Sequence, residues 1–528
     1  MAKKHEDKAQ KSLQFFNNQD VNQDVNLEPS RKVANGEISL SELEQYLWGA
    51  ANILRGPVDK ADFKSYIFPL LFFKRISDVY DEEYAAALLE SGGDEEYTNF
   101  PEQHKFSIPE GAHWKDVREK TENVGQAIQF AFREIEKANP ERLYGIFGDV
   151  LWTNKDRLSD ELLINLIEHF SSKVLPNSKI PPDMLGQAYE FLIKKFADMS
   201  NRKAGEFYTP RAIVHLMGSI LKPKETESIY DPACGSGGML LEAYQYVKDH
   251  KGDFRKLKLF GQEKNLTTSS ISRINLLLHG VEDFRIEKED TLRRPVFREN
   301  DQLSKFDVVI ANPPFSLKNW GFENWANDPF GRNFAGVPPK SYGDFAWVQH
   351  MIASMAPITG RMGIVLPHGA LFRSGVESRI RKHLIDADLL DCVIGLGPNL
   401  FYGTGISACI MVFRARKEPP KKNKVLFIDA SELYQKGRAQ NFFLNEHAKT
   451  VIDLYEKYSN VEGQSKIVCT DEIKENEYNL NISRYVKKPR AVEKIDLKAT
   501  LEELEAAYDE FVKSEDKMRM LLKEVKLL

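Results

Sequence analysis

The feature that most constrains the fold is a glycine-rich turn between a strand-like run and a helix-like run, in residues 228–241 (SIYDPACGSGGMLL). The run before the turn ends in an acid, Asp231, and the turn contains Gly235, Gly237 and Gly238. Glycines let a backbone approach a ligand closely, and the first N–H groups of the following helix are unpaired. The stretch therefore predicts a nucleotide-type cofactor turn at a strand end. Similar turns occur in many α/β proteins, so a second signal is needed.

The second signal is residues 306–315 (FDVVIANPPF), where an apolar strand leads into Asn312, two prolines and Phe315. The prolines remove backbone donors, so the carbonyl groups of Asn312 and Pro313 stay out of regular strand pairing. An amide oxygen and a fixed carbonyl oxygen can both accept from one –NH2 group, which turns its nitrogen lone pair toward an electrophilic methyl group. Phe315 offers a flat face for a planar substrate. The alternative, a strand end without a chemical role, is less favoured because the cofactor turn lies upstream.

Acidic residues end three of the predicted strands, at Asp231, Glu263 and Asp290. Ligands lie beyond the carboxyl ends of strands in an open parallel sheet, so these side chains are expected to line one site. Glu263 can accept from ribose hydroxyls and Asp290 from an adenine amino group. Neither G-x-G-x-x-G nor G-x-x-x-x-G-K-[ST] occurs, which disfavours a pyrophosphate cofactor or ATP. A cofactor with adenine, ribose and a zwitterionic tail fits better. Cys234 is interpreted as a small turn residue rather than a nucleophile.

The 528 residues are enough for several domains. Residues 1–36 are polar and rich in Asn and Gln, which predicts a flexible tail. Residues 37–200 carry helical apolar patterns, which predict a helical N-terminal domain. Residues 201–430 alternate strand-like and helix-like runs, which predicts an α/β catalytic domain with a doubly wound sheet. Residues 431–528 are mostly helical and charged, and we assign them to a C-terminal helical region for subunit assembly.

Local signals predict the individual elements. Ser39 and Glu42 have the spacing of a capping box and begin the first helix, and a long apolar helix with Pro69 near its start or at a kink follows. Later helices are expected at 123–138, 159–173, 184–199, 238–249, 266–279, 344–356 and 374–386. Strands are expected at 227–231, 257–262, 284–288, 306–311, 362–366, 390–396 and 406–413, with a further one at 424–428.

Two segments have two interpretations each. The last segment of the chain places apolar residues close to a heptad seam, so it forms either a helix docked on its own domain or a helix that packs against another subunit. The aromatic segment 316–343 directly follows the Asn-Pro-Pro-Phe motif. It is either a lid that closes over the substrate or a packed structural excursion.

Composition excludes several classes of protein. No run approaches the roughly 18 apolar residues of a membrane span, and the start lacks the apolar core of a signal peptide, so we expect a cytoplasmic protein without membrane contact. The four cysteines form no C-x-x-C pair, so neither a metal site nor a disulfide framework is expected. The net charge of −5 indicates that, if the chain acts on nucleic acid, part of the binding comes from another molecule.

Two motifs carry a resemblance to a known family. Residues 231–237 and 312–315 resemble the cofactor and catalytic motifs of S-adenosylmethionine-dependent amino-methyltransferases. Residues 206–211 (EFYTPR) stand where the adenine-N6 DNA enzymes with this motif order carry an additional cofactor segment. More narrowly, the chain resembles the modification (M) subunit of type I restriction–modification systems, through residues 47–51 (LWGAA), 68–75 (FPLLFFKR) and 185–192 (LGQAYEFL).

The resemblance implies a Rossmann-like methyltransferase fold with a seven-stranded sheet, S-adenosyl-L-methionine as the cofactor, and conversion of adenine in double-stranded DNA to N6-methyladenine. It also implies a separate specificity (S) subunit that reads the DNA, two modification chains per specificity subunit, and a restriction (R) subunit as a further partner. The expected catalytic residues are Asn312, Pro313, Pro314 and Phe315. The expected cofactor-binding residues are Glu206, Phe207, Tyr208, Thr209, Pro210, Arg211, Asp231, Gly235, Ser236, Gly237, Gly238, Glu263 and Asp290.

Other substrates stay open at this point. The same motif suits methylation of RNA guanine, protein glutamine or cytosine N4, because each presents a planar –NH2 group. The large helical domain and residues 206–211 favour the adenine enzymes over the first two. A non-catalytic assembly scaffold is the remaining alternative, and failure to bind cofactor would reveal it.

Overall fold

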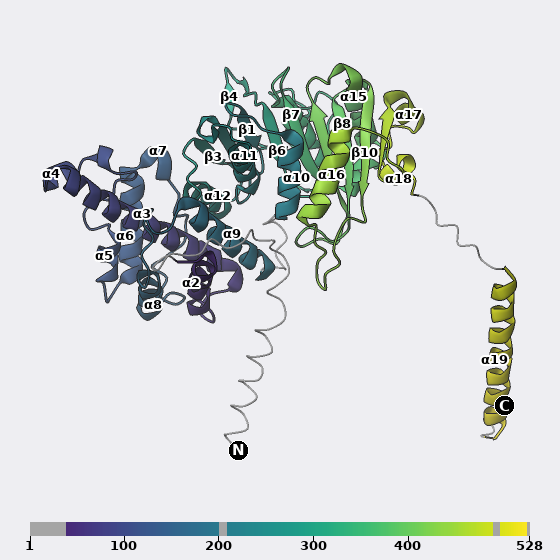
Figure 1. Cartoon of the computed structure of the whole chain (residues 1–528), viewed down its shortest axis with the longest axis horizontal. Helices are drawn as coiled ribbons and strands as arrows, with labels where there is room; N and C mark the ends of the chain where they lie inside the picture. Colours follow the sequence, from purple (N-terminus) through teal and green to yellow (C-terminus); the bar gives the residue numbers. More distant parts are fainter. Residues whose placement is uncertain (1–37, 200–208, 489–496, 525–528) are drawn as a thin grey trace.

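The computed structural model describes residues 38–199, 209–488 and 497–524 (Figure 1). The tail predicted at 1–36 lies outside these described residues, as do Glu206, Phe207 and Tyr208. A helical part comes first in the chain, a helix-covered sheet follows, and a single long helix comes last. None of the described helices is both long and apolar enough to cross a membrane.

The helical part is built around one apolar core. Residues 66–77 of α3 are all buried, because apolar side chains occur on every face of this stretch, and Pro69 lies inside the helix. The capping box expected at Ser39 is present: the Glu42 amide donates to Ser39 Oγ at 3.3 Å, and the Ser39 amide donates to Glu42 Oε2 at 2.8 Å. The helices are α2 (Leu40–Ile53), α3 (Phe63–Glu90), α4 (Glu95–Thr98), α5 (Trp114–Arg118), α6 (Val124–Ala138), α7 (Pro140–Leu143), α8 (Asp160–Ser171) and α9 (Pro182–Met199).

The central sheet has nine strands in the order β11–β10–β8–β9–β7–β6–β1–β2–β3. β9 is antiparallel to both of its neighbours and β11 is antiparallel to β10, while the other neighbouring strands are parallel. A short ribbon of β4 (Arg298–Glu299) and β5 (Gln302–Leu303) lies outside this sheet. The strands of the sheet are β1 (Ser228–Asp231), β2 (Lys258–Glu263), β3 (Phe284–Lys288), β6 (Val308–Ala311), β7 (Arg361–Pro367), β8 (Leu390–Leu396), β9 (Ala408–Arg414), β10 (Lys424–Ala430) and β11 (Ser465–Cys469).

Each strand contributes to two cores, because successive side chains point to opposite faces of the sheet. In β1, Ile229 is buried in the core on one face and Tyr230 in the core on the other. Helices α10, α11 and α16 contribute to the first core, and α14 and α15 to the second. The helices of this part are α10 (Arg211–Leu221), α11 (Gly238–Asp249), α12 (Leu266–Leu278), α13 (Phe322–Trp325), α14 (Asp344–Ala353), α15 (Val376–Asp386), α16 (Asn445–Lys457), α17 (Thr470–Glu475) and α18 (Ile482–Tyr485).

Helix α12 joins the helical part to the sheet. Its Ile271 is buried in the core of the helical part, whereas its Leu276 is buried in the core of the sheet. α9 packs against α12, and the absence of a side chain at Gly186 leaves room for the His279 ring. The Tyr189 hydroxyl of α9 donates to the carbonyl of Ile271 at 3.3 Å. These contacts hold α9 beside the sheet, close to the strand ends where the site is expected.

The sheet departs from the sequence-based expectation at one edge. The resemblance implied seven strands, and β10 and β11 extend the sheet to nine. The sheet therefore continues beyond residue 430, where the sequence predicted a change to a helical region. β11 has only five residues inside a charged, helix-rich stretch, and it forms by pairing with the edge of β10, with Val468 opposite Val425. Such long-range pairing leaves no local signal.

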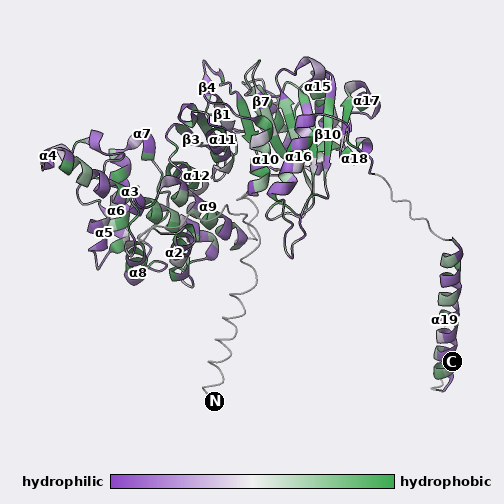
Figure 2. Ribbon diagram, in the orientation of Figure 1, coloured by the Kyte–Doolittle hydropathy of each residue, from purple (hydrophilic) through white to green (hydrophobic). Residues whose placement is uncertain are grey.

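The last helix, α19 (Leu497–Glu524), stands apart from the sheet in Figure 1. Its large apolar side chains are exposed, with Leu504 at 64%, Tyr508 at 65% and Phe511 at 60% of full exposure. Figure 2 shows these apolar residues as a broken green stripe on an otherwise polar helix. Of the two interpretations of this segment, the structure does not show the one in which the helix docks on its own domain.

Candidate active site

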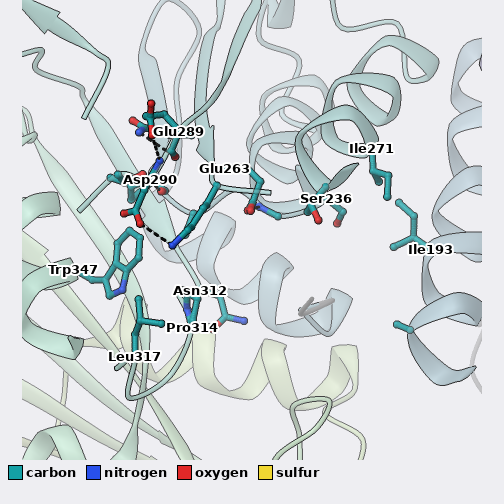
Figure 3. A pocket seen from close by; sticks show the side chains of 18 of the residues that line it. Ile193, Ser236, Glu263, Ile271, Glu289, Asp290, Asn312, Pro314, Leu317 and Trp347 are labelled. Carbon is teal, nitrogen blue, oxygen red and sulfur yellow. Dashed lines mark hydrogen bonds and ion pairs between the residues drawn. The ribbon is translucent and has the colours of Figure 1, made fainter. Parts of the chain in front are cut away.

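The two sequence motifs follow neighbouring strands. β1 and β6 pair in parallel, with Ile229 opposite Val308 and Tyr230 opposite Val309. The carboxyl ends of parallel neighbours meet at one edge of a sheet, so the glycine turn after β1 and the Asn-Pro-Pro-Phe motif after β6 lie side by side. A cavity of about 190 Å³ opens at this edge, and we call it the strand-end cavity. Gly235, Ser236, Glu263, Asp290, Asn312 and Pro314 are among its lining residues (Figure 3).

The glycine turn is shaped by close backbone packing. Gly235 and Gly237 have φ angles of +53° and +80°, in the left-handed region that favours glycine. A Cβ atom at Gly237 would lie 2.6 Å from Ser272 Oγ, so the turn fits tightly against α12. Gly237 and Gly238 do not line the cavity; they set the path of the chain into α11, which begins at Gly238. Burial raises the pKa of the Cys234 thiol well above its ordinary range, which agrees with a packing role rather than a nucleophilic one.

Two buried acids lie behind and beside the turn. Asp231 is 1% exposed, its Oδ1 accepts from the Ala233 amide at 3.0 Å, and burial, with the charge of Glu263 adding to it, raises the pKa of Asp231 to about 8. Glu263 Oε2 accepts from the Gly235 amide at 3.1 Å, and burial also raises the pKa of this carboxyl. No basic side chain among the described residues shifts Asp231 toward its charged form. A cationic ligand next to these acids would lower both pKa values.

Asp290 lies at the other end of the cavity. Its Oδ2 is 2.9 Å from Lys264 Nζ, and its Oδ1 accepts from the Arg293 amide at 3.2 Å. Figure 3 shows the pair with Lys264 as a dashed line beside Trp347. The Lys264 side chain is largely exposed, and exposed ion pairs contribute little to stability. A ligand amino group can therefore replace the lysine at small cost.

Asn312 has one satisfied and one unsatisfied polar atom. Its Nδ2 donates to Thr209 Oγ1 at 3.0 Å. Its Oδ1 is buried and has no hydrogen-bond partner in the described part of the chain. Pro313 behind it is buried, and the half-buried ring of Phe315 packs against Phe401 at a centroid distance of 5.6 Å and an interplanar angle of 66°. The amide is thus anchored on one side and offers an acceptor on the other.

The remaining predicted residues lie farther from the cavity. Pro210 is the N-cap residue of α10 and Arg211 its first residue. The Arg211 side chain is largely exposed, and its Nη1 lies 4.0 Å from Glu190 Oε2. Neither residue lines the strand-end cavity, and neither does Phe315. Of residues 209–211, Thr209 is the one that the structure connects to the catalytic motif.

The helical part also lines the cavity, which the sequence did not reveal. Lys64 and Phe68 of α3, together with Ile193 and Phe196 of α9, form the wall opposite the glycine turn. Figure 3 shows Ile193 facing Ile271 across the end of the cavity near Ser236. The apolar pattern of α3 signals burial but does not indicate which molecule or domain covers it. Trp347 of α14 was missed for the same reason.

The segment 316–343 is tightly packed. Trp320 and Trp325 are each 1% exposed, and their indole Nε1 atoms donate to the carbonyls of Pro339 (3.1 Å) and Leu292 (3.4 Å). The buried Arg332 pairs with the buried Asp328, with 2.6 Å between Nη2 and Oδ1. These contacts favour the packed structural excursion over the lid.

Comparison with known proteins identifies the family. A family model described as N-6 DNA Methylase matches residues 181–494, and one described as the HsdM N-terminal domain matches residues 43–170. The type I restriction enzyme MjaVII methylase subunit of Methanocaldococcus jannaschii is 33% identical over 479 residues, which are 86% of this chain and 79% of that protein. The chain belongs to the type I restriction enzyme methylase subunits. It is a DNA methyltransferase subunit of a type I restriction–modification system, as the resemblance implied.

Further relatives agree with this assignment. The HindI methylase subunit of Haemophilus influenzae is 31% identical over 407 residues, 72% of this chain and 89% of that protein. The crystal structure of a type I restriction–modification methyltransferase subunit from Streptococcus thermophilus aligns with a TM-score of 0.74 at 30% identity, over 85% of this chain and 100% of that chain. The predicted fold class is confirmed by this likeness, while the roles of individual site residues stay predictions.

Proposed function

We propose that this methylase subunit transfers a methyl group from S-adenosyl-L-methionine to N6 of adenine in double-stranded DNA, at a site chosen by a separate specificity subunit. The observation that carries the proposal is the buried, unpartnered Asn312 Oδ1, in a cavity that the amide shares with Gly235 and Glu263. Buried polar atoms are nearly always paired, so an unpaired acceptor at a cavity marks the place of a ligand donor. An exocyclic amino group is such a donor.

The chain's own residues fit this cofactor, which supplies an electrophilic methyl group on a cationic sulfur. The buried acids Asp231 and Glu263 favour a cationic ligand, since each has a raised pKa. Each oxygen of Glu263 accepts one backbone N–H and keeps a lone pair for a ribose hydroxyl. Asp290 accepts from the adenine amino group in place of Lys264. We assign cofactor binding to Glu206, Phe207, Tyr208, Thr209, Pro210, Arg211, Asp231, Gly235, Ser236, Gly237, Gly238, Glu263 and Asp290.

The target adenine is bound by the motif after β6. Asn312 Oδ1 and the carbonyl of Pro313 accept the two hydrogens of the amino group, so the nitrogen lone pair faces the methyl group. One of these hydrogens leaves as a proton to solvent when the new N–C bond forms. The base must leave the double helix to reach this position, at a cost of a few kcal/mol, and stacking on Phe315 offsets about 1–3 kcal/mol of that cost. Pro314 fixes the path of the chain between them.

Partners complete the proposal. The net charge of −5 is unusual for a protein that binds DNA over a long footprint alone. The exposed apolar stripe of α19 offers a surface for a helix of another subunit. We propose that two methylase chains bind one specificity subunit through this region in the cytoplasm, and that a restriction subunit is a further partner.

The test is methyl transfer from labelled S-adenosylmethionine to DNA, followed by base analysis. We expect N6-methyladenine when the co-encoded specificity subunit is present, and little label without it. Asn312→Ala should abolish transfer while S-adenosylhomocysteine still binds, and Asn319→Ala, on the neighbouring loop, is the matched control. Label in cytosine, or full activity of Asn312→Ala, would contradict the proposal.

A further inference from the structure

A second unpaired polar atom lines the strand-end cavity. Trp347 of α14 is 6% exposed, and its indole Nε1 is buried without a hydrogen-bond partner among the residues that the structure describes. Figure 3 shows the Trp347 ring beside Asp290, at the end of the cavity away from Ile193. Asn312 Oδ1 and Trp347 Nε1 are thus an unpaired acceptor and an unpaired donor on one cavity. A buried N–H group without an acceptor is costly, which points to an acceptor on a ligand.

The position of the Trp347 ring is fixed by the helix that carries it. Asp344, the first residue of α14, accepts from the Ser316 amide at 2.8 Å and pairs with Arg373 Nη1 at 2.6 Å. Farther along the helix, His350 Nε2 is 3.1 Å from the Tyr230 hydroxyl of β1. With both parts of α14 tied to the sheet and its loops, the indole N–H is held in place before any ligand arrives. Such preorganisation makes a polar group useful for discrimination.

The donor and the neighbouring acid together match one edge of adenine. Adenine presents an amino group on C6 and ring-nitrogen acceptors, N1 and N7, on either side of it. A 6-oxo purine presents an oxygen there instead of an amino group, which would face the Asp290 carboxylate acceptor to acceptor. An acid that accepts from the amino group and an indole that donates to an adjacent ring nitrogen therefore select adenine.

We propose that Trp347 is a specificity-determining residue for the cofactor: its indole N–H donates to N1 or N7 of the cofactor's adenine, beside the amino group bound by Asp290. The inference rests on the proposed function, because it takes S-adenosylmethionine as the ligand of this cavity. It adds a residue from α14, far in the chain from the glycine turn and from the acids at the strand ends. A site that rejects a ligand lacking one hydrogen-bonding group does so because its own buried group is then left unpaired.

The test combines one substitution with small changes in the ligand. Calorimetry measures the affinity of the full chain for S-adenosylhomocysteine and for its 1-deaza and 7-deaza analogues, in which a ring nitrogen is replaced by C–H. We expect the wild-type chain to bind one of the two analogues about three- to tenfold more weakly than the parent compound. Trp347→Phe should bind the parent more weakly by a similar factor and should not discriminate between the parent and that analogue.

Controls separate this role from packing. Trp320→Phe removes an N–H that donates to Pro339, outside the cavity, and should leave the discrimination intact. Equal discrimination by wild type and Trp347→Phe, or no discrimination by the wild type, would overturn the inference while leaving the proposed function in place. Failure of the wild-type chain to bind S-adenosylhomocysteine at all would overturn both.

Discussion

Replacement of Thr209 by valine tests whether a hydroxyl group holds the catalytic amide in place. Asn312 Nδ2 donates to Thr209 Oγ1 at 3.0 Å, in a partly buried setting. Valine keeps the shape of threonine but cannot accept a hydrogen bond, so the Asn312 amide loses its anchor and can rotate. Rotation would turn Nδ2, a donor, toward the substrate amino group, which is also a donor.

The expected magnitude follows from that single bond. An unpaired donor in a buried or partly buried position costs about 1–3 kcal/mol. If this cost falls on the transition state, methyl transfer slows by about 5- to 150-fold, because each 1.36 kcal/mol is a factor of ten in rate. The affinity for S-adenosylhomocysteine should change little, since the bond connects Thr209 to Asn312 rather than to the cofactor turn.

The assay is single-turnover transfer of a labelled methyl group to DNA, with the specificity subunit present and the cofactor saturating. Calorimetry measures cofactor affinity in parallel. Thr209→Ser retains the hydroxyl and should recover most of the rate. An unchanged rate in Thr209→Val, with weaker cofactor binding, would refute the reasoning and return Thr209 to the cofactor contact that the sequence predicted.

Three further outcomes are expected. Gly237→Ala should destabilise the fold by about 1–3 kcal/mol, because its φ is +80° and its Cβ would lie 2.6 Å from Ser272 Oγ, whereas the same change at Gly238 meets no atom within 4 Å among the described residues; equal urea midpoints would contradict this. The pKa of Asp231 is raised to about 8, above its unfolded value of about 3.9, so its contribution to stability is full below about pH 4 and is lost as pH rises toward 8. Asp231→Asn should therefore flatten the fall in stability between about pH 5 and pH 9, and melts that fall as steeply as those of the wild type would count against this. Removal of the residues after 490 should weaken binding to the specificity subunit while the melting temperature of the rest stays the same, since α19 is exposed; unchanged binding by size-exclusion chromatography would exclude this role.

Much of the catalytic fold was predictable because its signals are local. The helix expected at 238–249 is α11 (Gly238–Asp249), set by the glycine turn before it. The seven expected strands are all present, since burial on both faces makes them read as short apolar runs. The pairing of β1 with β6 also followed from the motif order, because strand ends gather at one edge of such a sheet.

The rest depends on contacts between distant parts of the chain. Phe68 and Phe196 line the strand-end cavity because α3 and α9 pack beside the sheet through α12, and an apolar helix alone does not reveal its partner. Trp347 likewise reads as an ordinary buried residue of α14. Thr209 was expected at the cofactor, and its bond to Asn312 joins residues far apart in sequence. None of these pairings has a periodic signature.

The most direct test of the account is a structure of the chain bound to a cofactor analogue, the specificity subunit and DNA. The account predicts the sulfur-bearing end of the cofactor over Gly235 and Ser236, and an extruded adenine whose amino group lies within hydrogen-bond distance of Asn312 Oδ1. A cofactor bound away from the glycine turn, or an amino group with no contact to Asn312, would contradict it.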